Sequence, residues 1–308
     1  MPAHTTSDGE RGAIVAIGGA EDKTRERHVL GRLVSLAGGS EANIAVFPVA
    51  SSIPTELGDA YVRVFRTLGA SNIHVFDIRR RDEAFDPERI KLLQECSLVF
   101  FTGGDQLRLV VTLGGTPMVQ TIRRMNAGGV PVAGTSAGAA CLCQHMIARG
   151  RSGKVAGRHM VNLAAGLGLT NRIVVDQHFS QRHRMGRLFS AVSMNPFLIG
   201  VGIDEDTAAC LDAHNRLTVW GKGSVTIVDG AELSYTNVHE VDGRKPATVI
   251  GLSVHVLTAG GSFDLVNRTG APAPVSLIEP VSANDDDPDE DSDEQLDPAD
   301  DLFPPEPA

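Results

Sequence analysis

Short, continuously apolar runs alternate with amphipathic stretches through the first two-thirds of the chain, and this alternation limits the possible folds more than any other feature. The apolar runs are residues 13–17, 44–49, 73–76, 98–101 and 130–133. Strands covered on both faces of a sheet are apolar throughout, whereas residues 29–34 and 61–68 have the spacing of amphipathic helices. Strands that alternate with helices form parallel sheets with right-handed crossovers. The sequence therefore predicts an α/β fold with a mostly parallel sheet flanked by helices.

Beyond residue 173 the apolar runs follow one another more closely. They cover residues 173–175, 197–203, 208–211, 217–220 and 225–228. Close spacing is typical of antiparallel neighbours, so we expect these strands to extend the sheet toward the C-terminus through antiparallel pairs. Neither an internal repeat nor an interdomain linker is visible. We therefore predict one α/β domain over residues 12–282, after a flexible N-terminus of residues 1–11.

The end of the chain is strongly acidic. Residues 281–308 contain twelve acidic residues and no Lys or Arg, while the whole chain has a net charge of −10, so the remainder is close to neutral. An acidic stretch of this kind cannot bury enough apolar surface to fold. We expect residues 283–308 to form a disordered tail that aids solubility. A near-neutral body with an acidic tail argues against nucleic acid as a partner.

The cysteines and the N-terminus bear on the compartment. Cys96, Cys141, Cys143 and Cys210 are too few, in a chain of 308 residues, to suggest a disulfide framework. We expect buried free thiols and a cytoplasmic protein. No apolar run approaches the roughly 18–20 residues that a membrane-spanning helix needs. Residues 1–11 lack the apolar core of a secretory signal, so no membrane association is expected.

No pattern in the sequence predicts a cofactor or a metal. Gly18 and Gly19 follow an apolar run, but the next residues do not complete a dinucleotide-binding fingerprint, and no phosphate-binding loop with Lys-Ser/Thr is present. The HExxH motif and paired cysteine ligands are absent as well. Chemistry carried by side chains alone is therefore expected.

The segment from Gly134 to Gly138 has the pattern G-x-S-x-G between an apolar run and a helix-like run that includes Met146 and Ile147. A nucleophile must stand exposed on a sharp turn from strand to helix, and flanking glycines remove the clashes that such a turn would create. Ser136 is therefore a candidate nucleophile. The amide of Ala137 would point into the site as an oxyanion donor. The alternative is an ordinary serine in a turn.

A serine nucleophile needs a base, and His178 is the best candidate. It follows the apolar run 173–175, which brings it to an edge of the sheet. A third group must orient the imidazole. The acidic residues Asp204, Glu205 and Asp206 close the next apolar run, and spacing alone does not choose among them.

Three arginines, Arg182, Arg184 and Arg187, lie within six residues shortly after His178. One interpretation is a solvated helix face. The other is the capture of substrate carboxylates by bidentate guanidinium groups.

Five segments together resemble one family, the cyanophycinases among the peptidase E-like serine hydrolases of peptidase family S51. The segments are IGGAED (17–22), FTGGDQ (101–106), GTSAGA (134–139), DQHFSQR (176–182) and GIDEDTA (202–208). The resemblance spans roughly residues 12–265 and implies a fold similar to class I glutamine amidotransferase domains. It also implies that the 12–282 domain is a serine exopeptidase. Its substrate would be cyanophycin (multi-L-arginyl-poly-L-aspartate), cleaved to β-Asp-Arg dipeptides by a homodimer.

The resemblance also implies roles for individual residues. The triad would be Ser136, His178 and Glu205, and the oxyanion hole would use the amides of Gly104 and Ala137. Substrate binding would involve the residues Gln106, Asp176, Gln177, Arg182, Arg184 and Arg187. Within this set, the three arginines would bind the carboxylates of the arginyl branches, and Gln106 and Asp176 would accept from the branch guanidinium groups.

Two other functions compete with this one. The first is a related dipeptidase that cleaves Asp-X or isoaspartyl dipeptides. The arginine cluster argues against it, because a small substrate needs fewer carboxylate anchors. The second is an inactive protein that only binds cyanophycin, and an intact Ser136, His178 and Glu205 set argues against that.

Overall fold

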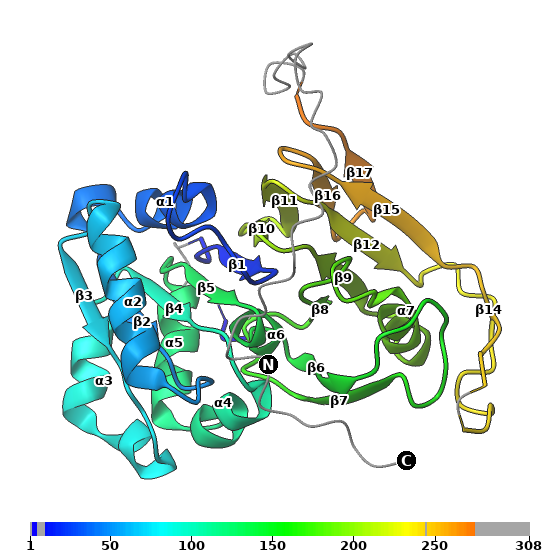
Figure 1. Ribbon diagram of the computed structural model, residues 1–308, viewed down its shortest axis with the longest axis horizontal. Helices are drawn as coiled ribbons and strands as arrows, with labels where there is room; N and C mark the ends of the chain where they lie inside the picture. Colours follow the sequence, from blue (N-terminus) through cyan, green and yellow to red (C-terminus); the bar gives the residue numbers. More distant parts are fainter. Residues whose placement is uncertain (1, 5–9, 244, 275–308) are drawn as a thin grey trace.

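The computed structural model describes residues 2–4, 10–243 and 245–274 (Figure 1). The acidic tail predicted for residues 283–308 lies outside these described residues. Two large sheets dominate the described part of the chain, one with nine strands and one with four.

The nine-stranded sheet is parallel in one half and antiparallel in the other. Its strands, in spatial order, are β17 (Thr269–Ala271), β16 (Ser262–Asp264), β11 (Arg216–Gly221), β10 (Thr207–Leu211), β1 (Ile14–Ile17), β5 (Val132–Thr135), β4 (Leu98–Phe101), β2 (Asn43–Phe47) and β3 (Asn72–Val75). Neighbours from β1 to β3 pair in parallel. Neighbours from β17 to β1 pair antiparallel. The predicted α/β fold, with its antiparallel extension toward the C-terminus, is confirmed.

Helices cover both faces of the parallel half (Figure 1). They are α1 (His28–Leu36), α2 (Pro54–Thr67), α3 (Pro87–Gln94), α4 (Gln106–Leu113) and α5 (Pro117–Ala127), with the short 3₁₀ helices η1 (Gly39–Glu41) and η2 (Arg81–Phe85) between them. Val15 and Ile17 of β1 pack into the core under α1 and α2, and Ile14 and Ala16 pack into the core on the opposite face. Successive residues of a strand point to opposite faces, so a strand between two helical layers must be apolar at every position.

The four-stranded sheet lies beside the first. Its order is β15 (Ser253–Leu257), β12 (Val225–Asp229), β9 (Ile199–Ile203) and β8 (Ile173–Asp176). One face shares the core of the nine-stranded sheet, and the other is covered by α7 (Met185–Met194). The expectation that every strand after residue 173 extends the first sheet is correct for β10 and β11. It is wrong for β8, β9 and β12, because an apolar run does not specify its pairing partner.

The segment after Ser136 also differs from the prediction. The helix-like run through Met146 and Ile147 is a short helix, α6 (Ala137–Cys141), followed by the strand β6 (His145–Gly150). The strand β6 forms a hairpin with β7 (Val161–Ala165), and another two-stranded pair is β13 (Tyr235–Thr236) with β14 (Val249–Ile250). Met146 and Ile147 of β6 are both buried. The apolar spacing therefore predicted their burial correctly, but it predicted a helix where the structure has a strand.

All four cysteines are free and buried, as predicted. Among the described residues, no helix is both long and apolar enough to cross a membrane.

Candidate active site

Ser136 stands on a sharp turn between β5 and α6. Its backbone has φ 51° and ψ −116°, an unfavourable conformation for a residue with a side chain. The flanking glycines make room for this turn. A Cβ on Gly134 would lie 2.5 Å from the carbonyl carbon of Gly138, and a Cβ on Gly138 would lie 2.4 Å from the main-chain oxygen of Phe101. The G-x-S-x-G pattern therefore reflects backbone contacts on both sides of Ser136.

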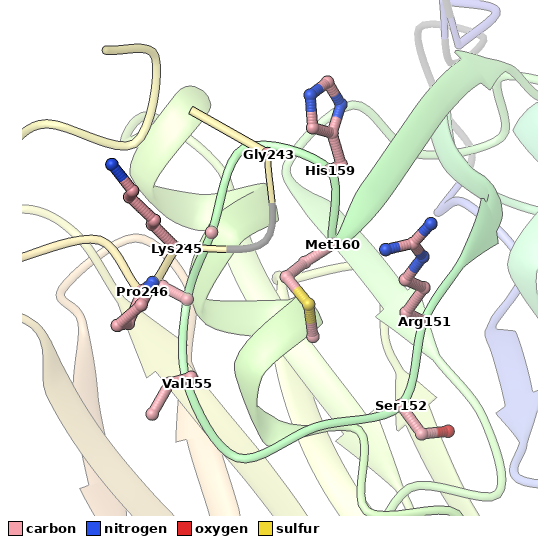
Figure 2. Close-up of a pocket in the computed structure, with 10 residues that line it drawn as sticks. Arg151, Ser152, Val155, His159, Met160, Gly243, Lys245 and Pro246 are labelled. Atoms are coloured by element: carbon pink, nitrogen blue, oxygen red, sulfur yellow. The ribbon is translucent and has the colours of Figure 1, made fainter. Parts of the chain in front are cut away.

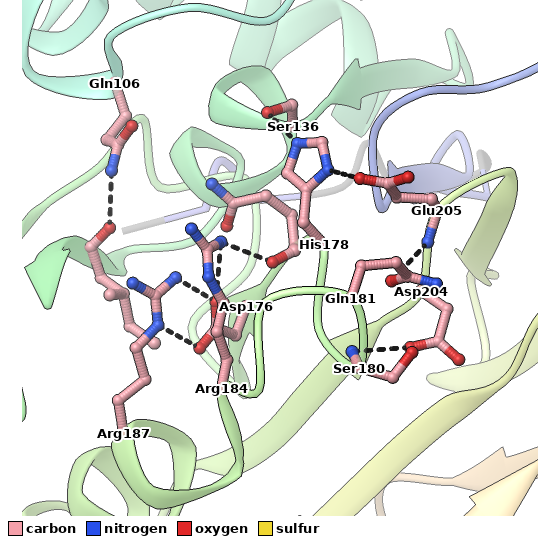
Figure 3. A network of polar contacts seen from close by, with 12 residues as sticks. Gln106, Ser136, Asp176, His178, Ser180, Gln181, Arg184, Arg187, Asp204 and Glu205 are labelled. Atoms are coloured by element: carbon pink, nitrogen blue, oxygen red, sulfur yellow. Dashed lines mark hydrogen bonds and ion pairs between the residues drawn. The ribbon is translucent and has the colours of Figure 1, made fainter. Parts of the chain in front are cut away.

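His178 follows β8 and reaches Ser136 from the four-stranded sheet. Its Nε2 lies 2.9 Å from Ser136 Oγ (Figure 3). The residue also has a positive φ of 47°, and its amide donates to the main-chain oxygen of Gly18 at 2.8 Å. The imidazole is thus held by the backbone of the β1 turn as well as by its own strand.

Glu205 lies in the connection between β9 and β10, where the chain passes from one sheet to the other. Its Oε1 is 2.5 Å from His178 Nδ1. The side chain of Gln181 accepts from the Glu205 amide at 3.2 Å and so supports this connection. The structure brings Ser136, His178 and Glu205 into one continuous line of contacts (Figure 3).

The two acidic neighbours of Glu205 are engaged elsewhere. Asp204 accepts from the amides of Ser180 and Ser224 at 3.0 and 3.1 Å. Asp206 accepts from the amide of Asp22 at 2.8 Å. Spacing could not separate the three acids, and geometry does, because only Glu205 contacts the imidazole.

The environment of His178 favours its neutral form. Burial lowers the pKa of the imidazole, and the positive charge of Arg182 lowers this pKa further. The hydrogen bond and charge of Glu205 raise the pKa but do not outweigh the other effects. A neutral imidazole near pH 7 can accept a proton from the serine hydroxyl.

The two expected oxyanion donors belong to turns that flank Ser136. Gly104 follows β4, has φ 134°, and could not carry a side chain, since its Cβ would lie 2.2 Å from the oxygen of Ala50. A Cβ on the preceding Gly103 would lie 3.3 Å from Ser136 Cβ, which places this turn against the serine. Ala137 is the first residue of α6, where amides have no acceptor within the helix.

Asp176, Arg184 and Arg187 form a buried ionic cluster. Arg187 donates to both carboxylate oxygens of Asp176, with Nε at 2.6 Å from Oδ2. Arg184 Nη1 lies 3.5 Å from Asp176 Oδ1 and donates to the main-chain oxygen of Gln177 at 2.5 Å. Asp176 is fully buried, and both arginines are at least nine-tenths buried.

This cluster bears on two interpretations of the sequence. Arg184 and Arg187 do not lie on a solvated helix face. Asp176, expected to accept from a substrate guanidinium, accepts from Arg187 of its own chain and forms an ion pair with Arg184, and its role toward the substrate stays a prediction. A buried carboxylate needs such partners, because an unpaired charge is costly to desolvate.

The other expected substrate-binding residues are Gln106, Gln177 and Arg182. Gln106 donates from Nε2 to the main-chain oxygen of Ala148 at 2.6 Å. Gln177 is buried, and its Oε1 has no hydrogen-bond partner among the described residues. Arg182 is partly exposed and lies close enough to His178 to lower its pKa.

A cavity of about 320 Å³ lies apart from this site. It is lined by the connection between β6 and β7, including Arg151 and His159, and by Gly243, Lys245 and Pro246 (Figure 2). None of the three residues in the line of contacts borders it. Sequence patterns gave no signal for this cavity or for the support that Gln181 gives to Glu205, because neither depends on a regular spacing.

Known proteins provide an independent comparison. The pattern of peptidase family S51 matches residues 14–217. A cyanophycinase of Trichormus variabilis is 46% identical over 269 residues, which cover 87% of this chain and 90% of the relative. A cyanophycinase of Geminocystis herdmanii is 44% identical over 255 residues, covering 82% of this chain and 94% of the relative. The crystal structure of a peptidase from an acI-B1 actinobacterium has a similar fold, with a TM-score of 0.60 at 22% identity over 83% of this chain and 97% of that one.

The fold, together with a serine on a strained turn beside a histidine, defines a hydrolase of the serine type. The chain belongs to peptidase family S51.

Proposed function

We propose that the protein is a serine exopeptidase that hydrolyses cyanophycin to β-Asp-Arg dipeptides, with Ser136, His178 and Glu205 as its triad. The observation that carries the catalytic part is the line of contacts from Ser136 Oγ through the imidazole to Glu205. The proposed substrate is supported by relatives named cyanophycinase at 43–46% identity over most of the chain.

In the proposed reaction Ser136 Oγ attacks the scissile carbonyl while His178 Nε2 accepts the hydroxyl proton. The imidazolium then gives this proton to the leaving amine, and water hydrolyses the acyl-enzyme by the reverse sequence of proton transfers. A general base in this position typically accelerates the reaction by about 10²–10⁴-fold. Glu205 would hold Nδ1 protonated, which leaves Nε2 free to accept. The amides of Gly104 and Ala137 would stabilise the oxyanion, and each donor of this kind is worth roughly 3–4 kcal/mol of the barrier.

Charge supports the choice of polymer. Each arginyl branch of cyanophycin has a free carboxylate, and the ionic cluster near His178 contains two arginines, Arg184 and Arg187, with Asp176. Arg182 adds a further cation near the imidazole. The unpartnered Oε1 of Gln177 supports a role for this side chain as an acceptor for a substrate guanidinium.

One assay tests the proposal against its competitors. The protein is incubated with purified cyanophycin and, separately, with simple Asp-X and isoaspartyl dipeptides, and the products are identified by mass spectrometry. We expect β-Asp-Arg from the polymer, no such activity from Ser136→Ala, and little cleavage of the dipeptides. Cleavage of dipeptides alone would identify the dipeptidase instead, and release from neither substrate would leave only the binding protein.

We also infer a cytoplasmic homodimer with one catalytic domain over residues 12–282. Four free buried thiols fit a reducing compartment. Two-fold dimers are the commonest soluble oligomers. Sedimentation velocity tests the dimer, and a single species at the mass of one chain would rule it out.

A further inference from the structure

The turn that follows β1 contains a buried carboxylate that the proposed reaction does not use. Glu21 is 3% exposed. Its Oε2 accepts from Thr135 Oγ1 at 2.5 Å, and its Oε1 accepts from the hydroxyl of Tyr61 and lies 3.3 Å from Lys23 Nζ. Burying a carboxylate costs free energy that its partners must offset, so such a group needs a reason to be there.

Thr135 is the last residue of β5 and directly precedes Ser136. The hydrogen bond to Glu21 therefore fixes the side chain of Thr135, directly before Ser136 with its strained backbone. A strained backbone persists only when its surroundings determine it. Gly134 and Gly138, on either side of the serine, have no side chains that could help to hold its backbone in place.

The same turn also contacts the segments that carry the other two triad residues. The main-chain oxygen of Gly18 accepts from the amide of His178 at 2.8 Å, and that of Gly19 accepts from the amide of Asp206, next to Glu205, at 3.0 Å. A Cβ on Gly19 would lie 2.3 Å from His178 Cε1, so the turn packs directly against the imidazole. The turn thus touches the nucleophile, base and acid segments at once.

We propose that Glu21 is a positioning residue of the active site, which holds the Ser136 turn in register with His178 through Thr135. The proposal rests on the proposed function in one respect, namely that Ser136 is the nucleophile. Glu21 itself touches neither substrate nor a reacting atom. A misplacement of about 1 Å in a catalytic group can cost about 10²-fold in rate.

The test removes the contact from either end. Glu21→Gln keeps the size of the side chain and removes its charge, and Thr135→Val keeps the shape and removes the hydroxyl. Thr135→Ser restores the hydroxyl. The matched control is Thr121→Val, a buried threonine on α5. Active sites are counted with a fluorophosphonate that labels Ser136, so that kcat refers to folded, competent enzyme.

With cyanophycin as substrate, Glu21→Gln and Thr135→Val should lower kcat per labelled site by about 10–100-fold, with KM changed by less than about threefold. Their rate of labelling by the fluorophosphonate should fall in parallel. Thr135→Ser should retain most of the wild-type kcat, and Thr121→Val should match the wild type. If Glu21→Gln does not fold, the comparison of Thr135→Val with Thr135→Ser decides the question.

Wild-type kcat per labelled site in Glu21→Gln and Thr135→Val would overturn the proposal, even if both proteins unfold at lower temperature, because Glu21 would then only stabilise the fold. The labelling rates keep this result separate from the question of substrate. If the wild type is labelled at Ser136 but releases no dipeptide from cyanophycin, the proposed substrate is wrong, and the labelling rates of the variants still decide the role of Glu21.

Discussion

The two sides of the proposed active site are held in place by different means. The nucleophile side, named for the proposed role of Ser136, comes from the parallel half of the nine-stranded sheet, where glycines, close backbone contacts and the hydrogen bond of Thr135 to Glu21 set the position of Ser136. The base side comes from the four-stranded sheet, where side chains and charges set the position of His178, with Asp176 and its arginines next to it. Apart from the contact of Thr135 with Glu21, the first side should therefore be sensitive mainly to added atoms, and the second mainly to altered charge.

The largest effect should come from the residue that links the two sides. Glu205→Gln keeps the size of the side chain but removes the charge that holds Nδ1 of His178 protonated. We expect kcat/KM to fall by about 10³–10⁴-fold, since the wrong tautomer of the base cannot accept the serine proton. Steady-state assays of dipeptide release measure this. The control is Asp206→Asn, whose amide oxygen can still accept from the Asp22 amide. Equal losses of kcat/KM in the two variants would show that Glu205 is no more important to the reaction than Asp206.

The next effect tests charge on the base side. Asp176→Asn leaves two buried arginines without their carboxylate, and breaking a buried pair in this way costs about 3–5 kcal/mol. Urea unfolding should show this loss in the free energy of unfolding. Asp82→Asn serves as the control, because its ion pair with Arg80 is exposed and should be worth little. An unchanged free energy of unfolding in Asp176→Asn would mean that the charge of Asp176 does not stabilise the fold.

A single added methyl group tests the nucleophile side. Gly138→Ala would place Cβ 2.4 Å from the main-chain oxygen of Phe101, so the Ser136 turn must shift. We expect kcat to fall by about 10²-fold. Gly31→Ala on α1 makes the same change where the nearest atom is 3.8 Å away, and its activity should be unchanged. Full activity of Gly138→Ala would show that the turn tolerates movement.

The smallest effect concerns pH. The charge of Arg182 lowers the pKa of His178, so Arg182→Gln should raise this pKa. More of the imidazole is then protonated at mildly acidic pH, and the acid limb of the activity profile moves to higher pH. The rate of fluorophosphonate labelling as a function of pH measures this without involving substrate binding. Arg151→Gln, at the separate cavity, should leave the limb in place. A shift of the acid limb to lower pH in Arg182→Gln would mean that Arg182 raises the pKa of His178, contrary to the prediction.

The same two sides differ in what the sequence could reveal. Every strand of the parallel half was predicted to within about two residues. For β1, β2, β4 and β5 the reason is that a strand covered on both faces must be apolar throughout, whereas no residue of the edge strand β3 is buried. Ser136 was identified for a related reason, since its turn requires glycines at fixed positions. The apolar runs and the glycine pattern each involve residues close together in the sequence, and such patterns can be recognised without knowing the fold.

On the base side the decisive contacts join distant residues. The strands β8, β9 and β12 were recognised, but their pairing into a second sheet was not. Asp176 looked like a free acceptor because its partner Arg187 lies on α7, eleven positions along the chain. Glu205 could not be separated from Asp204 and Asp206 by spacing, since the choice depends on which carboxylate faces the imidazole.

The burial of all four thiols has a practical consequence. Burial raises the pKa of Cys96, Cys143 and Cys210 to about 12, and it raises that of Cys141 as well. Alkylating reagents attack the thiolate, so the folded protein should be nearly inert to them at neutral pH. Each cysteine then becomes alkylated only when its own region opens. Because Cys141 and Cys143 lie just after Ser136 while Cys210 lies on β10, the order of alkylation would time the loosening of the Ser136 region against that of the antiparallel half of the nine-stranded sheet.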